Sequence, residues 1–278
     1  MTAAAVKRTV SVGLVGVFTA CTPAASPPSS PVDVPLEVPP ISADASANTK
    51  SSGVRFHRVP STVGSTWHVS VEAESHTEDP QGGEQLSTYR SEYDVAVLGV
   101  DGGAPSRVKL AFQTNVYGYQ YADKPTAVHG RSYIVDVEVP HVRDAQGAAP
   151  TEEETERVLD VFPDLGTRTR IDEMLPDDAM QIGERRDELA PAVLRVIHPR
   201  AWTLISGSAS LAAADAELAR FDVTLDASSQ SRVHMKVTGG AWVRMRDARL
   251  VRLELDGTYD HGAGTTGAFK LRRSVSDR

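Results

Sequence analysis

Short runs of alternating apolar and polar residues recur from about residue 53 to the C-terminus, and they constrain the fold more than any other feature. In the run 67–74 every second residue is apolar and the residues between are mainly polar. Similar runs follow at 93–98, 108–112, 133–139, 202–205, 219–225, 233–237, 241–245, 250–255 and 268–271. Strands of this kind pack one face on a core and expose the other. Turns such as 101–103 (Asp-Gly-Gly) would join them. The sequence therefore predicts an α+β protein with a mostly antiparallel sheet.

Two segments in the middle of the chain have helical character. Thr151 and Glu154 have the spacing of a capping box and predict a helix over about 151–162. Apolar residues at helical spacing predict a second helix over about 184–197, where Pro191 marks either a start or a bend. We expect a curved sheet or open barrel packed by one or two central helices.

The two strand-rich halves of the chain show faint similarity. The runs that start at Trp67, Tyr93 and Ser106 can be aligned with those that start at Trp202, Phe221 and Ser231. The offsets between the aligned runs drift instead of holding one period. A duplicated sheet unit and chance similarity between alternating strands are both open interpretations.

The first residues have the order of a secretory signal peptide. Lys7 and Arg8 precede a short apolar run that ends with small residues at Ala20. This run is far shorter than the roughly 20 residues that a membrane-spanning helix needs. We predict that residues 1–20 are a signal peptide that is removed on export.

Cys21 is the only cysteine of the chain and stands directly after this segment. Together with Thr19 and Ala20 it resembles a bacterial lipobox, in which the cysteine is lipidated and becomes the new first residue. The resemblance implies that acylated Cys21 anchors the protein in a lipid bilayer. An ordinary secreted protein cleaved near Ala20 is the alternative.

Residues 22–52 form a second distinct segment. They contain seven of the 17 prolines, many Ser and Ala residues and no aromatic residue. Such a segment buries too little apolar surface to offset its ordering entropy, so 21–52 is predicted to be the lipidated cysteine with a disordered tether and 53–278 the folded body. A Pro-rich ligand for an aromatic groove is the alternative. Thr22, in place of Asp, favours the outer membrane by analogy with Gram-negative lipoprotein sorting, and leaves the side of that membrane open.

The overall charge argues against a nucleic-acid partner. The chain has 29 Lys and Arg against 37 Asp and Glu, a net charge of −8. Phosphate contacts need clustered cations. The arginines of the C-terminal strands are therefore expected to be solvated strand positions: Arg244, Arg246, Arg249 and Arg252.

No highly specific catalytic, cofactor or metal motif occurs, and we predict no cofactor. His68, Glu72, Glu74 and His76 share one face of a predicted strand. That set would extend about 26 Å, too far for one metal ion, so a solvated face is favoured. The acidic run 152–156 fits compensation of a helix dipole. The acidic residues between 172 and 178 lack the spacing of a calcium loop.

Three tyrosines provide the strongest sign of a binding surface. Tyr117, Tyr119 and Tyr121 alternate along one predicted strand and would project from a single face. An aromatic row of this kind can line a ligand groove or a partner surface. A row of ordinary core or cross-strand packing residues is the favoured interpretation of the pattern.

Several short pieces of the chain occur in a characteristic order. They are 129–133 before a strand, the Thr-Glu-Glu-Glu helix start at 151–154, the Leu-Pro turn at 175–176, 180–184 before an apolar helix, and Leu-Asp-Gly at 255–257. This order resembles an uncharacterised family of bacterial secreted lipoproteins. The resemblance implies an exported β-rich lipoprotein and brings no catalytic residue with it.

Three classes of function follow from these observations. The leading prediction is a non-enzymatic, membrane-anchored envelope lipoprotein that binds an apolar ligand or an envelope protein on the concave face of its sheet. It implies a cavity lined by apolar and Tyr side chains, without a converging acid–base pair. An envelope hydrolase would instead place at least two His, Glu or Asp side chains within hydrogen-bond reach in a cleft. A purely structural envelope component would have a filled core and no pocket.

Overall fold

The computed structural model describes residues 53–78, 81–120, 122–136, 141–161, 170–197, 202–229, 233–262 and 264–278. The predicted signal peptide, Cys21 and tether lie outside these residues. Among the residues described, no helix has the length and apolar character that a membrane crossing requires.

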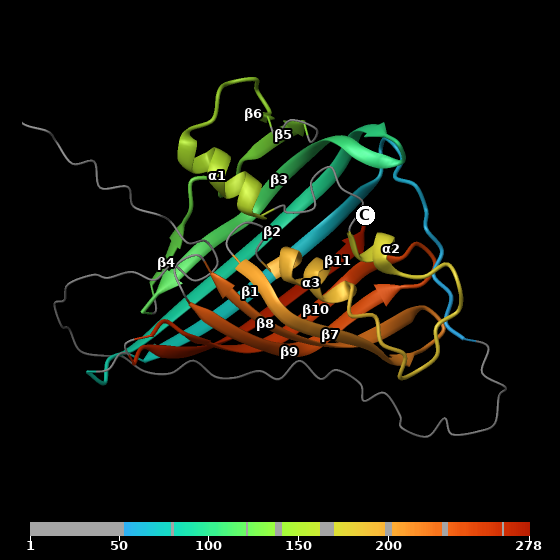
Figure 1. Ribbon diagram of the computed structural model, residues 1–278. Coiled ribbons are helices and arrows are strands. Elements are labelled where there is room, and N and C mark those ends of the chain that lie inside the picture. The colour runs from blue at the N-terminus through green and yellow to red at the C-terminus, as the bar shows by residue number, and fades with distance from the viewer. Residues whose placement is uncertain are drawn as a thin grey trace, which may run out of the picture.

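The described strands belong to one antiparallel sheet that curls strongly without closing into a barrel (Figure 1). They are β1 Thr66–Glu78, β2 Glu84–Asp101, β3 Ala104–Tyr119, β4 Ala122–Pro125, β5 Ser132–Asp136, β6 His141–Asp144, β7 Trp202–Ala214, β8 Leu218–Ser229, β9 His234–Arg244, β10 Arg249–Asp260 and β11 Thr266–Asp277. Their order across the sheet is β6-β5-β3-β2-β1-β11-β10-β9-β8-β7, with β4 paired to β3. The prediction of a mostly antiparallel α+β protein with a curved sheet is confirmed.

The first and last long strands lie side by side in the middle of the sheet. β1 pairs with β11 from Trp67 opposite Asp277 to Glu78 opposite Thr266, and with β2 along its other edge. Figure 1 shows this contact as cyan β1 beside red β11. The pairing joins the two described halves of the sheet into one body.

Three helices accompany the sheet: α1 Glu152–Val161, α2 Arg170–Met174 and α3 Leu189–Ile197. Two of them correspond to the predicted helices, and α2 was not predicted, because five residues are too few to show a helical period. Pro191 lies in the first turn of α3, so this helix begins near the proline instead of bending there. α3 packs on β7 and β8, and α2 contacts α3 and β10.

The capping box of α1 is confirmed. The backbone N–H of Thr151 donates to Glu154 Oε2 at 2.7 Å, and the backbone N–H of Glu154 donates to Thr151 Oγ1 at 3.2 Å. The side chain of Glu154 is buried, and its Oε1 also accepts hydrogen bonds from the Tyr133 hydroxyl at 2.7 Å and from Arg131. This one carboxylate therefore joins the start of α1 to β5 and to the residue that precedes it.

The core consists of two clusters of buried apolar side chains. The larger packs α2 and α3 on β7–β11 and includes Phe221 and Leu253. The smaller packs α1, through Val158, on β1, β2, β3, β5 and β6. Val71 on β1 is half-buried and contacts both clusters, so it marks the boundary between them.

Some details differ from the sequence prediction. The runs 233–237 and 241–245 were expected as separate strands, but most of both belong to β9, which continues through Gly239 and Gly240. The short strands β4 and β6 were not predicted. The turn between β2 and β3 is a two-residue turn with positive φ at Gly102 and Gly103, as Asp-Gly-Gly suggests. The matched runs lie on β1–β3 and around β7–β9, two successive meanders, and their common origin stays a prediction.

Candidate functional site

Strand register identifies the side chains that share the inner, concave face of the sheet. Gly207 lies against Ala190 of α3, which places it on this face. Directly paired residues of antiparallel strands lie on the same face. From β7 to β3, one row of such pairs runs through Gly207, Leu225, Val237, Gly257, Phe269, Ser75, Ser87 and Tyr119. The face that α3 covers at β7 therefore continues to Tyr119 on β3.

The character of this face changes along the row. Over β8–β11 its side chains are mostly apolar and buried, whereas over β1–β3 half-buried residues appear among them. We call seven of these half-buried residues on β1, β2, β3 and β11 the inner strip: Val71, Ala73, Ser87, Tyr89, Tyr117, Tyr119 and Arg273. The principal strand contacts of α2 and α3 are with β7, β8 and β10, not with the strands that carry the strip.

Two of the three predicted tyrosines lie in this strip. Tyr117 and Tyr119 project from the same face of β3, and the Tyr117 hydroxyl donates to Ser87 Oγ at 3.0 Å. Tyr121 lies outside the described residues. Tyr89 on β2 is directly opposite Tyr117 and was missed by the sequence analysis, because only the pairing of β2 with β3 brings the two together. The binding role of the tyrosines stays a prediction.

A buried polar residue next to the inner strip forms hydrogen bonds that position Tyr89. Asn115 on β3 is fully buried, and its Nδ2 donates to the Tyr89 hydroxyl and to Ser91 Oγ, both at 2.9 Å. Its Oδ1 accepts a hydrogen bond from the Thr126 hydroxyl at 2.6 Å. These bonds fix the position of Tyr89. A single Asn in an alternating strand gives no sequence signal of this role.

Arg273 is the one charged member of the inner strip. It lies on β11, directly opposite Val71 on β1 and Leu253 on β10. No hydrogen bond or ion pair joins its guanidinium to any residue that the structure describes. Its place on β11 is in phase with the apolar residues Phe269 and Leu271, but alternation alone predicts no role for it.

The opposite, outer face of β1 carries the four residues considered as metal ligands. Three of them have a local partner, since His76 Nε2 lies 2.8 Å from Glu74 Oε1 and His68 Nδ1 lies 2.9 Å from Asp94 Oδ1. Within the described part of the chain, no group of three or more His, Cys, Asp or Glu side chains could hold a metal ion. The same holds for the described acidic residues between 172 and 178, of which Asp177 pairs with Arg58 at 3.0 Å.

The pair of His68 and Asp94 bears on the hydrolase alternative. Asp94 also accepts a hydrogen bond from Gln113 at 2.7 Å and forms an ion pair with Arg278 at 2.6 Å. Ser276 on β11 lies opposite His68, which gives a Ser-His-Asp row across three strands. No hydrogen bond between Ser276 and His68 occurs in the described structure, and neither residue lines the hollows described next.

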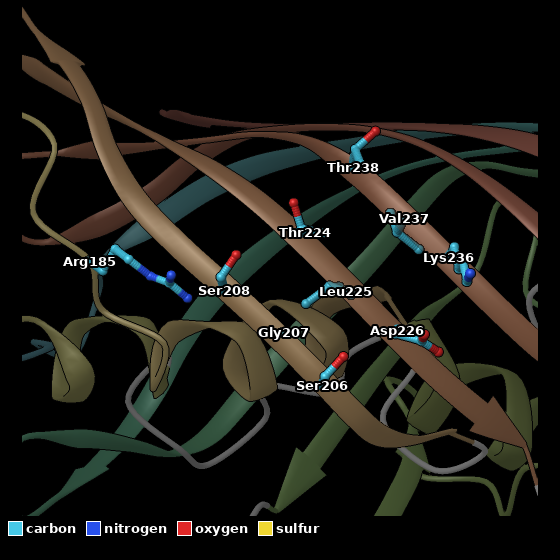
Figure 2. Close-up of a pocket in the computed structure, with 10 residues that line it drawn as sticks. All are labelled: Arg185, Ser206, Gly207, Ser208, Thr224, Leu225, Asp226, Lys236, Val237 and Thr238. Atoms are coloured by element: carbon cyan, nitrogen blue, oxygen red, sulfur yellow. The ribbon is translucent and has the colours of Figure 1, made fainter.

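Two hollows of about 450 and 420 Å³ lie on the outer face of the sheet. Figure 2 shows the first, where the hydroxyls of Ser208, Thr224 and Thr238 point away from the helices. The second shares Thr224 and Thr238 and extends to Trp242. Polar side chains of this kind are typical of a solvated sheet face. The predicted cavity with apolar and Tyr lining stays a prediction.

The four arginines near the C-terminus are engaged by acidic and aromatic side chains. Asp277 forms ion pairs with Arg244 at 2.7 Å, Arg246 at 3.1 Å and Arg249 at 3.2 Å. The hydrogen bond from Arg244 holds the pKa of Asp277 below its usual value. Arg252 pairs with Glu254 at 2.5 Å and lies 4.8 Å from the ring centre of Trp242.

Comparisons with known proteins add little to this description. No protein-family model matches the chain, and no curated protein matches it. One similar solved structure is that of a DUF1329 family protein from Desulfovibrio piger, with 9% sequence identity, a TM-score of 0.16, and coverage of 75% of this chain and 84% of that chain. At this TM-score the likeness supports no inference about fold or function.

Proposed function

We propose that this protein is a non-enzymatic binding module that holds an apolar ligand against the inner strip. The supporting observation is the uneven covering of the concave face. The two core clusters fill neighbouring parts of this face, whereas Ala73, Tyr89 and Tyr117 are only half-buried. Concave apolar surfaces with a few placed hydroxyls are typical ligand sites.

The shape of the site favours a small ligand over a protein partner. The strip lies on the concave face of the sheet, next to both clusters, since Val71 packs against each of them. The curl of the sheet that forms this face is visible in Figure 1. A stable protein interface needs about 800 Å² on each partner. A narrow concave strip offers less room to a protein surface than to an extended apolar chain, so we assign the site to a small molecule.

A hydrolase is less well supported. Its best constellation, the row of Ser276, His68 and Asp94, lies on the outer face of the sheet. Acyl-transfer chemistry of this kind requires a nucleophile hydrogen-bonded to its base and donors aimed at the developing oxyanion. The described contacts supply the bond between base and acid, but not the bond between nucleophile and base.

Filling the strip should prevent ligand binding. Ala73→Trp places an indole between Tyr89 on β2 and Leu271 on β11. We expect the affinity of residues 53–278 for the fluorescent apolar probe N-phenyl-1-naphthylamine to fall at least about tenfold, or by about 1.4 kcal/mol. Probe titration measures this, and a thermal melt confirms that the variant is folded.

Glu74→Trp is the matched control, since Glu74 is the next residue and lies on the outer face. It should leave the probe affinity within about twofold. Equal affinities of Ala73→Trp and Glu74→Trp would contradict a site on the inner strip. If a copurifying protein is lost from Ala73→Trp but not from Glu74→Trp, the occupant of the strip is a protein partner and not a small molecule.

We also propose that the protein is exported and anchored in the outer membrane by acylated Cys21, with 22–52 as a tether. The lone cysteine at a lipobox-like junction supports this. Cys21→Ser should move the protein from the membrane to the soluble fraction of the cell envelope. The control Thr22→Ser keeps Cys21 and should stay in the membrane fraction. Unchanged membrane association of Cys21→Ser would refute the anchor and leave the ligand site untouched.

A further inference from the structure

We infer that the ligand of the inner strip carries an anionic oxygen group and that Arg273 binds this group. The inference rests on the proposed function and adds the chemical class of the ligand: an apolar chain with a carboxylate or phosphate head.

The position of Arg273 on the concave face follows from two independent observations. Along β11, Phe269 and Leu271 are buried, while the residues between and after them, Lys270 and Arg272, are exposed, and Arg273 follows the buried phase. The pairing of β1 with β11 shows no register shift, and it sets Arg273 opposite Val71. A slip of one residue would turn every side chain of β11 to the other face.

Among the residues that the structure describes, none forms an ion pair with Arg273. Its direct cross-strand neighbours, Val71 and Leu253, are apolar. The inward-facing carboxylate of Asp277 lies four residues further along β11, about 13 Å away by strand geometry. That carboxylate already pairs with three other arginines.

A half-buried guanidinium among apolar side chains is unfavourable unless its N–H groups find acceptors. Nothing in the described fold requires a cation at this position, because Arg273 makes no described hydrogen bond or ion pair. A ligand with an anionic oxygen group would supply hydrogen-bond acceptors for the guanidinium of Arg273. The planar fork of arginine also favours carboxylate or phosphate, which can accept two parallel hydrogen bonds.

The strip provides a path for the rest of such a ligand. Arg273 lies in the cross-strand row of Val71 and Ser91, and Ala73, Tyr89 and Tyr117 lie in the next row, two residues away along each strand. Three strand spacings and this step of about 6.6 Å separate Arg273 from Tyr117 on β3 by about 16 Å. Ala73, Tyr89 and Tyr117 line this path and are half-buried. The apolar part of the ligand would therefore lie across the strands, with its charged end at β11.

Binding of two probes that differ only in their head group tests the inference. Dodecanoate and dodecan-1-ol are titrated into residues 53–278, and inorganic phosphate serves as an anion without a chain. Dodecanoate should bind at least about tenfold more tightly than dodecan-1-ol, since charge-assisted hydrogen bonds form only with the carboxylate. Inorganic phosphate should bind at least about a hundredfold more weakly than dodecanoate, because it lacks the buried chain.

Arg273→Met should remove this preference. Dodecanoate should then bind at least about tenfold more weakly than it binds to the unaltered protein, while dodecan-1-ol binds as before. Arg272→Met removes the same charge one residue away on the exposed face and should change neither affinity. Without ligand, Arg273→Met should melt at or above the temperature of the unaltered protein, because a functional unpaired charge contributes no stability.

Equal binding of the two probes, or full dodecanoate affinity in Arg273→Met, would overturn the inference and leave the proposed apolar site in place. Phosphate binding as tight as that of dodecanoate would also overturn it, in favour of a free anion. A lower melting temperature of ligand-free Arg273→Met would assign a structural role to Arg273. If neither probe binds, the proposed apolar site fails together with the inference.

Discussion

Glu154→Ala should lower the free energy of unfolding by about 4 kcal/mol, as expected when one partner of a buried ionic network is removed. The side chain of Glu154 is 3% exposed and accepts hydrogen bonds from Arg131, Tyr133 and the backbone of Thr151. Its loss leaves the Tyr133 hydroxyl buried without this acceptor and removes the cap of α1. Urea denaturation followed by circular dichroism measures the effect.

Glu153→Ala is the control for this prediction. Glu153 is the preceding residue, lies in the same first turn of α1 and is exposed. Its replacement removes one favourable interaction with the helix dipole and should change stability by no more than about 0.5 kcal/mol. Similar losses in both variants would show that Glu154 acts only through helix charge, and not as the junction between α1 and β5.

Gly207→Leu should lower stability by about 3 kcal/mol, the upper part of the usual range for overpacking. A Cβ at Gly207 would lie 2.7 Å from the Cβ of Ala190 and 3.2 Å from the carbonyl oxygen of Thr224. A larger side chain must therefore push α3 away from β7 and loosen the larger core cluster. Chemical denaturation measures the loss.

The matched control introduces the same side chain one residue later. Ser208 lies on the outer face, where its hydroxyl points away from the helices (Figure 2). Ser208→Leu should change stability by no more than about 1 kcal/mol. Equal losses of stability in Gly207→Leu and Ser208→Leu would contradict the close packing of α3 on β7.

Much of this fold follows from local patterns in the sequence. Alternation predicts strands because its period matches the two faces of a sheet, and Thr151 with Glu154 predicts the start of α1 because both partners of the cap lie in one turn. The split of β9 into two runs was wrong, because Gly239 and Gly240 interrupt the apolar pattern inside a continuous strand. β4, β6 and α2 have four or five residues each, too few to show a period.

The site was only partly predictable for a different reason. Tyr117 and Tyr119 share a face through their spacing alone, but their neighbours depend on which strands pair. The pairing of β1 with β11 joins residues about 200 positions apart in sequence, and alternation does not specify such a partner. The phase of Arg273 with Phe269 and Leu271 was visible in the sequence. Its location on the concave face beside Val71 could be inferred only once the strand order and pairing were known.

The most direct test of the ligand site is the mass of purified residues 53–278 under native conditions, compared with the mass of the same sample after denaturation. A binding module with a half-covered apolar strip should retain a small molecule from the cell. We predict an excess native mass that is lost on denaturation and belongs to an apolar compound with an anionic head. A native mass equal to that of the bare chain, with no uptake of added dodecanoate or dodecan-1-ol, would contradict the account.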